Sequence, residues 1–296
     1  MKIRTVSCVL RMWGLTKKRS NLGLDYKKIL RVMSWIDVNK SPNIIPSAIE
    51  HELRLASGEL EMICHRWGGV DVEKFLKSLE LEHVKMQFLK SLAYCNKSKE
   101  SSLGQTLFAS NLSIKFEIAV PGGFGYKGQG LNIFYAWREN LFGDYLIAVT
   151  DQGVCGLAFE LDDGRASTEK NLFSSWKRAA ISESHAKTEP YAIDHLDPRH
   201  KTEVLAIGTQ FQIKIWKALL KVPLAAVVSY QKLSSIAGES RGARAVGGAL
   251  AKNQISWLIP CHRVVSSSGD ISGYRWGLNR KRAMLSWEGL NECTIN

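Results

Sequence analysis

The spacing of apolar residues changes twice along this chain of 296 residues, and that change limits its fold more than any other feature. From Asp25 to about Leu92, apolar residues recur every three or four positions, as on one face of a helix. From Leu131 they alternate or run in short segments, which is typical of strands, and from Thr209 the helical spacing returns. The sequence therefore predicts an α+β fold with a helical N-terminal region, a small antiparallel sheet subdomain and a helical C-terminal subdomain.

Shifts in composition give the expected boundaries between these parts. Residues 1–25 are basic and without pattern, so we expect an N-terminal extension there. The breaker cluster Val120-Pro121-Gly122-Gly123 marks the end of the helical region, which we place at 26–127. The sheet subdomain is expected at 128–203 and the C-terminal subdomain at 204–296.

The C-terminal subdomain carries local signals for its first helix. Thr209 and Gln212 have the spacing of a capping box, in which each side chain bonds to the backbone of the other residue. The apolar residues that follow fall on one helical face, and Pro223 stops the pattern. We therefore expect a helix that begins directly after Thr209.

Two further helices are expected after it. Ser229 is a candidate N-cap for a helix over 230–237, which Gly238 ends, and Ser240 is a candidate cap for a helix over 241–252. Two helices joined by a short turn that contains glycine predict a helix-turn-helix unit, in a winged-helix-like subdomain.

The second of these helices is rich in small residues and carries two arginines between Arg241 and Ala249. Its glycines cost about 3 kcal/mol of helix propensity relative to alanine, so a close contact should justify them. That contact is either a partner that approaches the helix backbone or tight packing of the helix in the core.

Cys261 and His262 are the residues whose pairing indicates a chemistry. Only a thiolate is a useful nucleophile, and a free cysteine, with a pKa of about 8.5, is mostly protonated at neutral pH. A base must therefore take its proton, and adjacent residues can cooperate only if the chain turns directly after Pro260. The alternative for an isolated Cys-His pair is a buried thiol beside a structural imidazole.

Charge and cysteine content limit the partners. The formal net charge is +12 and the pI is near 9.4, and residues 201–296 hold 13 Lys or Arg against 5 Asp or Glu, which favours a polyanionic partner. Six cysteines without any Cys-x-x-Cys pair argue against a zinc module and a disulfide framework, so we expect no metal, no cofactor and a reducing cytoplasm. We identify no signal peptide and no apolar run of the roughly 20 residues that a membrane helix needs, so we expect no membrane association.

A long series of motifs surrounds the Cys-His pair. The segment from 131 to 290 resembles the O6-alkylguanine-DNA alkyltransferase (methylated-DNA--protein-cysteine methyltransferase) family, whose signature is Pro-Cys-His-Arg, and the similarity is strongest from 208 to 289. The matching residues are Gly208-Thr209-Gln210-Phe211-Gln212, Ile215-Trp216-Lys217-Ala218-Leu219, Val222-Pro223, Ser229-Tyr230, Arg244-Ala245-Val246-Gly247, Asn253, Pro260-Cys261-His262-Arg263-Val264, Gly273-Tyr274 and Glu288.

The resemblance implies DNA repair by a single, irreversible transfer of an alkyl group, mainly methyl, from O6 of guanine, and also from O4 of thymine, to Cys261. It assigns His262 as the base that acts through a water, Glu288 as the group that orients it, and Asn253 as the residue that fixes the turn. Tyr230 is implied to donate a proton toward the base and to crowd the phosphate as the nucleotide rotates out.

The resemblance also implies how the chain meets DNA. It implies binding from the minor groove to double-stranded DNA that contains O6-alkylguanine, with extrusion of the damaged base because O6 lies on the major-groove edge. We expect a monomer, since asymmetric damage needs no two-fold protein. Arg244 is implied to enter the base stack. The full implied DNA-binding set is Arg244, Arg241, Ala243, Gly247 and Tyr230, and the implied base pocket is Val264, Tyr274, Arg275 and Trp276.

Part of the helical region resembles an AraC-type helix-turn-helix unit in an Ada-like arrangement. The segments that carry this resemblance are Arg66-Trp67-Gly68-Gly69-Val70, Phe75-Leu76 and Leu81-Glu82-His83. The unit is degenerate, since Met62 and Cys64 replace the usual Arg and Phe and carboxylates lie close by, which opposes phosphate binding. Two alternatives to repair are an Ada-like transcriptional regulator and a non-catalytic relative that binds damage.

Two further features depart from the family pattern or refine it. Ala225 stands where the family has a turn glycine, and Val227 where it has a hydroxyl, which predicts strain at the entry to the helix-turn-helix. Trp276 is bulkier than the glycine of some members, which predicts a narrower pocket and a preference for methyl over benzyl groups.

Overall fold

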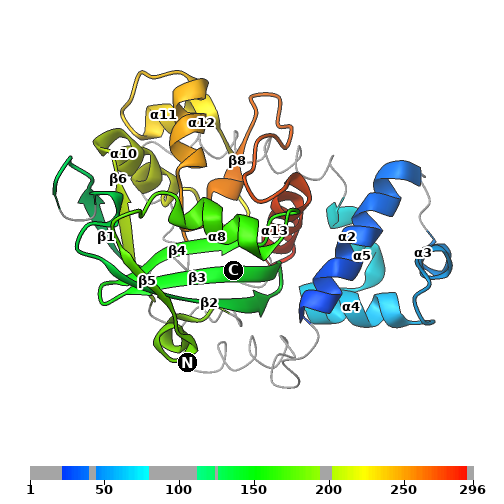
Figure 1. Ribbon diagram of the computed structural model, residues 1–296. Helices are drawn as coiled ribbons and strands as arrows, with labels where there is room; N and C mark the ends of the chain where they lie inside the picture. The colour runs from blue at the N-terminus through cyan, green and yellow to red at the C-terminus, as the bar shows by residue number, and fades with distance from the viewer. Residues whose placement is uncertain (1–21, 40–44, 80–111, 124–125, 194–201, 292–296) are drawn as a thin grey trace, which may run out of the picture.

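The computed structural model describes residues 22–39, 45–79, 112–123, 126–193 and 202–291 (Figure 1). The helical N-terminal region consists of α2 (Leu22–Asn39), α3 (Pro46–Leu53), α4 (Glu59–Gly68) and α5 (Val72–Leu79). The helix α2 begins inside the span predicted as an extension, and residues 1–21 of that span lie outside the described residues, as does Leu81-Glu82-His83. The turn between α3 and α4 contains Gly58 in the left-handed conformation (φ 75°), which is the arrangement expected of a helix-turn-helix.

One six-stranded sheet forms the centre of the molecule. Its strands lie in the order β1-β6-β4-β3-β2-β5. Strands β2, β3 and β4 are antiparallel, as the sequence predicts, but the pairs β1–β6, β4–β6 and β2–β5 are parallel, so the sheet is mixed. The strands are β1 (Leu112–Ile118), β2 (Asn132–Asn140), β3 (Gly143–Thr150), β4 (Gly153–Phe159), β5 (Ala180–Glu183) and β6 (Thr202–Gly208).

The sheet extends beyond the predicted subdomain at both ends. Strand β1 lies within the span predicted as helical region (26–127), and β6 crosses the predicted boundary at 204. The two strands pair with each other from Leu112↔Thr202 to Ile118↔Gly208. This pairing joins segments that are far apart in the chain, and neither strand carries a local signal that names its partner.

The C-terminal helices begin and end near the predicted caps. α10 (Gln210–Leu219) starts with the capping box of Thr209 and Gln212, and the Ser229 side chain caps α11 (Tyr230–Ile236). Gly238 is left-handed (φ 68°), as expected of a terminator. The helix α12 (Ala243–Ala251) starts two residues later than predicted because Gly242, and not Ser240, is its N-cap.

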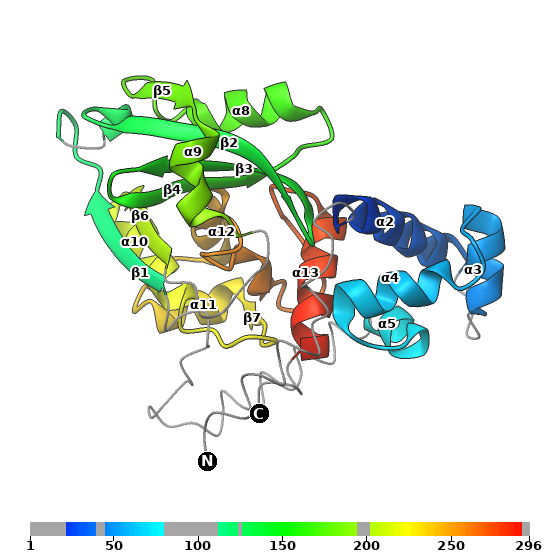
Figure 2. The same ribbon diagram turned by 90° about the horizontal axis from the view of Figure 1, so that it is seen from below.

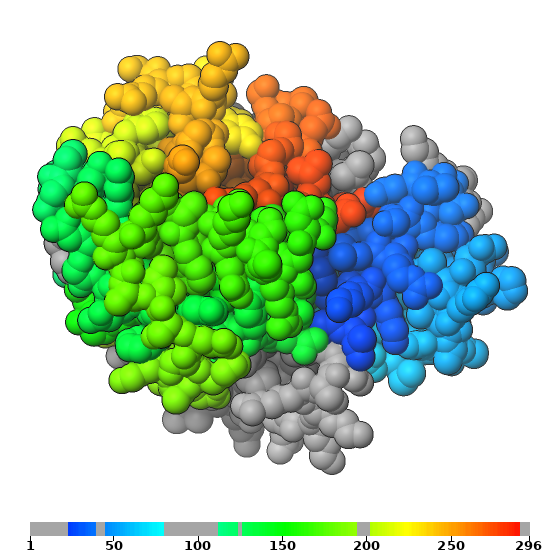
Figure 3. All heavy atoms as spheres, in the orientation of Figure 1, coloured from blue at the N-terminus to red at the C-terminus, as the bar shows by residue number. Residues whose placement is uncertain are grey.

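The last helix joins the two halves of the molecule. α13 (Leu278–Asn291) lies between the sheet and the N-terminal helices, with α4 and α5 against it (Figure 2). The short strands β7 (Val228–Ser229) and β8 (Val264–Val265) pair with each other. The helix α8 (Arg165–Phe173) packs against β4. One apolar core runs through the N-terminal helices, the sheet and the C-terminal helices, so the N-terminal lobe in Figure 3 is packed onto the rest. Within the described ranges, no helix combines the length and apolar character needed to cross a membrane.

Candidate active site

A sharp turn places Cys261. Pro260 (φ −80°, ψ 63°) is the centre of a three-residue turn closed by a hydrogen bond from Cys261 N to Ile259 O (2.8 Å), and the single 3-10 turn η3 (Cys261–Arg263) follows. Cys261 is half-buried, whereas His262 and Arg263 are buried. The predicted turn after Pro260 is therefore present.

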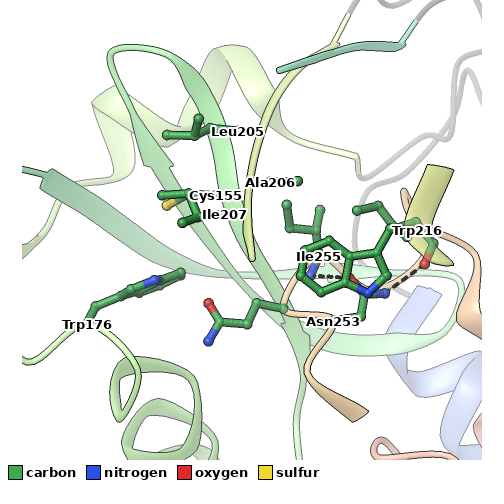
Figure 4. A pocket seen from close by; sticks show the side chains of 10 residues that line it. Cys155, Trp176, Leu205, Ala206, Ile207, Trp216, Asn253 and Ile255 are labelled. Carbon is green, nitrogen blue, oxygen red and sulfur yellow. Dashed lines mark hydrogen bonds between the residues drawn. The ribbon is translucent and has the colours of Figure 1, made fainter. Parts of the chain in front are cut away.

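Asn253 holds both ends of the loop that leads to this turn. Its Nδ2 donates to Ile259 O (2.9 Å), and its Oδ1 accepts from Ile255 N (3.0 Å) (Figure 4). The same Nδ2 also donates to Cys261 Sγ (3.3 Å). A cavity of about 10 Å³ lies behind the loop, between Asn253, Cys155 and Trp216. That volume is at the lower limit of what one water molecule needs, so this cavity cannot receive a nucleobase.

His262 is buried and bonded to a carboxylate. Its Nε2 lies 2.9 Å from Glu288 Oε1, and its Nδ1 is buried without a hydrogen-bond partner among the described residues. The ring stacks on Trp257, with centroids 5.1 Å apart and planes 11° apart. Burial lowers the pKa of His262, and the Glu288 carboxylate opposes that shift. The imidazole is therefore set to be neutral at pH 7, with Nδ1 as its unpaired nitrogen.

Glu288 is the most heavily bonded group of the site. Arg263 Nε donates to both of its oxygens (3.1 and 3.0 Å), Arg263 Nη2 donates to Oε1 (2.8 Å), and Ala225 N donates to Oε2 (3.1 Å). Burial raises the pKa of Glu288, but Arg263 and His262 outweigh burial and lower it to about 2. Ala225 is left-handed (φ 59°), which is the conformation that the missing turn glycine would favour.

Lys281 is a buried cation that sequence reasoning missed. It is fully buried, and its Nζ donates to Val264 O (2.5 Å) and Ser272 O (2.7 Å). Burial lowers the pKa of Lys281 to about 8, while the Cys261 thiolate opposes the shift. Lys281 lies seven residues before Glu288 on the same helix, so its place on the inward face was a signal that could have revealed it.

The thiol itself is not pre-ionised by these groups. Burial raises the pKa of Cys261, and the Asn253 hydrogen bond, Lys281 and Arg275 only partly offset it. To act as a nucleophile, Cys261 would therefore need a base beside it that takes the thiol proton.

Of the predicted pocket residues, Tyr274 and Arg275 lie close enough to Cys261 to interact with it electrostatically. Val264 is buried under Lys281, and the Tyr274 hydroxyl lies 2.8 Å from Ser256 Oγ, with its pKa raised well above the usual range by burial. The Arg275 guanidinium lies over the Trp276 ring, 5.2 Å from its centroid, and donates to Asn171 of α8. Trp276 is only 2% exposed, so its ring belongs to the core beneath the loop.

Tyr230 lies between α12 and this loop. Its hydroxyl donates to Ser272 O (3.4 Å), and a Cβ added at Gly247 would lie 3.8 Å from its ring. A Cβ at Gly273 would lie 3.4 Å from its hydroxyl. Tyr230 therefore joins the pocket loop to the predicted DNA-binding helix.

The start of α12 is exposed. Arg241, Ala243 and Arg244 are exposed, Gly247 is half-buried, and the Arg241 guanidinium lies 4.5 Å from the centroid of Phe211. A side chain added at Gly248 would meet no atom within 4 Å. Packing in the core therefore does not require this glycine, and the close approach of a partner stays a prediction. Among the described residues, no hydrogen bond joins Arg241 or Arg244 to the Cys261 network.

The C-terminal half of the chain is similar to known proteins. Residues 210–290 match the family model described as 6-O-methylguanine DNA methyltransferase, DNA binding domain. The chain is 34% identical over 173 residues to the bifunctional transcriptional activator/DNA repair enzyme Ada of Escherichia coli, a match that covers 57% of this chain and 49% of that protein. It is also 34% identical over 163 residues to the inducible methylated-DNA--protein-cysteine methyltransferase of Bacillus subtilis, covering 51% of this chain and 89% of that protein.

The Bacillus subtilis match extends over nearly the whole relative, so the chain belongs to the methylated-DNA--protein-cysteine methyltransferase family. The resemblance drawn from the motifs is thereby confirmed. The chain spans about half the length of the first relatives it matches, the Ada proteins (49%). Among solved structures, the O6-methylguanine methyltransferase of Mycobacterium tuberculosis matches with a TM-score of 0.43 and 29% identity, over 53% of this chain and 93% of that chain.

Proposed function

We propose that this chain repairs DNA by transferring an alkyl group, mainly methyl, from O6 of guanine to Sγ of Cys261, once per molecule. The same reaction is proposed for O4 of thymine. The observation that carries the proposal is a pair of contacts on neighbouring residues: Asn253 donates to Sγ of Cys261, and Glu288 holds Nε2 of the adjacent His262. A nucleophile, a base and a group that orients the base are the parts that nucleophilic catalysis needs.

The proposed reaction uses each part once. His262 Nδ1 accepts the thiol proton through a water, and Glu288 stabilises the imidazolium that forms. Sγ then attacks the alkyl carbon, so that an S–C bond forms and the C–O6 bond breaks with its electron pair on the base. A proton delivered through Tyr230 makes the leaving guanine neutral. The thioether product is not a leaving group at neutral pH, which is why we propose one turnover.

DNA is the proposed partner. The exposed start of α12, with Arg241, Ala243 and Arg244, and Gly247 further along, is proposed to enter the minor groove of double-stranded DNA as a monomer. Arg244 takes the place of the extruded nucleotide, and Val264, Tyr274, Arg275 and Trp276 form the pocket that receives it. Extrusion costs less for alkylated guanine, which pairs poorly, than for an intact base. Because the reacting thiol must stay reduced, we propose the cytoplasm as the compartment.

The N-terminal helices are proposed to support the fold and not to bind DNA. The helix α4 stands in the position of a recognition helix, but its charged side chains are engaged within the protein. Glu59 pairs with Lys28, Glu61 with His65, and Arg66 with Asp25. A role as an Ada-like transcriptional regulator therefore has no observation in its favour on this helix.

The test is the mass of Cys261 after reaction with DNA. The protein is incubated with a duplex that contains O6-methylguanine, and the peptide that carries Cys261 is analysed by mass spectrometry, with Cys261→Ala as the control. We expect one methyl group on Cys261 of the wild type, loss of the lesion in equal amount, and neither change with the variant. A wild type that leaves the lesion intact while its thiol stays titratable would overturn the proposal.

A further inference from the structure

Trp257 makes the only ring contact to His262 among the described residues. The two rings are stacked face to face, and both are buried, with exposed fractions of 6% for Trp257 and 0% for His262. Stacked and edge-on aromatic pairs contribute about 0.5–1.5 kcal/mol beyond the burial of their area. Trp257 therefore limits the plane in which the imidazole can lie, while Glu288 fixes only its Nε2 end.

The backbone of Trp257 is held in an unfavourable conformation. Its φ is +67°, in the left-handed region, and Leu258 N donates to Ser256 O (2.8 Å) across it. A non-glycine residue in this region costs about 1–2 kcal/mol. Such a conformation persists only where the surroundings determine it, and it is found preferentially at functional sites. The loop thus keeps a strained geometry that aims this indole at His262.

Further aromatic rings contact Trp257. Phe142 lies 4.7 Å and Trp287 5.8 Å from Trp257, measured between ring centroids. Trp67 of α4 then packs edge-on against Phe142 at 6.2 Å. Trp67, Phe142, Trp257, Trp287 and His262 therefore form one buried aromatic cluster that reaches from the N-terminal helices to the proposed base.

Hydrogen bonds anchor this aromatic cluster in the N-terminal helices. Trp67 Nε1 donates to Leu141 O (2.8 Å), and Trp287 Nε1 donates to Trp67 O (3.1 Å). Three further bonds hold α13, which carries Trp287 and Glu288, against α2 and α5. Ser286 Oγ donates to Ser78 O (2.6 Å), and Arg282 donates to Asp37 Oδ1 (2.7 Å) and to Leu79 O.

We propose that Trp257 is a positioning residue for His262, and that the N-terminal helices hold it in place through Trp67 and Phe142. The degenerate helix-turn-helix unit thereby acts on the reaction centre without contacting DNA. The inference deepens the proposed function and rests on it, because it assigns a role relative to the base of that reaction. Its effect is on Nδ1 of His262, the nitrogen that faces no protein partner.

The test measures the thiol without DNA. Iodoacetamide alkylation of Cys261 is followed across pH 5–9 by peptide mass spectrometry, which separates this cysteine from the other five. The variants are Trp257→Ala, Trp257→Phe, Trp67→Leu and, as the matched control, Trp137→Leu on β2, a half-buried tryptophan bonded to Glu169. The transfer rate from the O6-methylguanine duplex and the unfolding free energy are measured on the same samples.

We expect Trp257→Ala to lower alkylation of Cys261 at pH 7 about tenfold, a part of the roughly 10²–10⁴-fold that a general base can contribute, and Trp257→Phe to restore most of it. Trp67→Leu should lower it in the same direction by a smaller factor. In Trp257→Ala, the acid limb of the profile should move to higher pH. Water then reaches the His262 imidazole, and the pKa of His262 rises toward its ordinary value. The charged or titratable groups that face this imidazole are Glu288, Arg263, Lys281 and Cys261. Trp137→Leu should leave the profile as in the wild type.

Two outcomes overturn the inference. Either the Cys261 profile is unchanged in Trp257→Ala while stability falls, or Trp67→Leu and Trp137→Leu have the same effect on it. A wild type that fails to transfer alkyl groups from DNA would instead refute the proposed function, and the iodoacetamide profile would still decide the inference about Trp257.

Discussion

Glu288→Gln should destabilise the protein in a way that depends on pH. The carboxylate is buried against Arg263 and His262, and its pKa falls from an ordinary 4.5 to about 2 on folding. That fall corresponds to about 3 kcal/mol of stability, similar to the roughly 3–5 kcal/mol that breaking a buried ion pair costs. Since the pKa is lower in the folded protein, this stability is fully present above pH 4.5 and is lost as the pH falls toward 2.

The assay compares wild type and Glu288→Gln by urea unfolding, followed by circular dichroism, at pH 7 and pH 3. Glutamine keeps the shape of the side chain but does not titrate, so the gap between the two proteins should shrink from about 3 kcal/mol at pH 7 to about 1.4 kcal/mol at pH 3. Glu203→Gln, an exposed position on β6, should leave the unfolding free energy unchanged at both pH values. The reasoning is refuted if the Glu288→Gln gap is equal at the two pH values.

Three further predictions concern the turn, the DNA-binding helix and the pocket. Ala225→Gly should change the unfolding free energy by less than about 1 kcal/mol. Glycine relieves about 1–2 kcal/mol of strain in the left-handed conformation, but it also increases the entropy of the unfolded chain and removes a buried methyl group, and these effects offset the gain. Urea unfolding that shows a larger loss would contradict this. Arg244→Ala should slow transfer from duplex DNA but not from the free O6-methylguanine base, which needs no extrusion, and equal slowing on both substrates would count against its proposed role. Trp276→Gly should raise the ratio of benzyl to methyl transfer rates within the same variant, and an unchanged ratio would show that the ring does not limit the pocket.

Local signals predicted the parts of the site that depend on neighbours in the chain. The capping box at Thr209, the cap at Ser229 and the left-handed Gly238 each need only a few adjacent residues, and all three are present. The expectation that Ala225 occupies a turn that glycine would favour follows from the same kind of signal, and its φ of 59° agrees with it.

Local sequence signals could not predict contacts between segments that are far apart in the chain. The parallel pairing of β1 with β6 joins strands that no hairpin connects, so the apolar alternation of residues 112–118 could not name its partner. The bond from Arg275 to Asn171 and the stack of Trp257 on His262 likewise depend on how separate elements pack. A sequence motif can thus predict which residues form the site, whereas the residues that position them are known only once the packing of the core is known.

Several charged groups of the helix-turn-helix unit pair with one another within the N-terminal helices. Arg66 donates to both oxygens of the buried Asp25 (2.8 and 2.7 Å), so a cation that could meet a phosphate is used to join α4 to α2. The same α4 presents Trp67 to Phe142 and, through its carbonyl, to Trp287. A unit that neutralises its own cations loses the counterion release that drives DNA binding. In the role proposed above, its hydrogen bonds to α13 help to hold Glu288 and His262 in place, and that role requires no affinity for DNA.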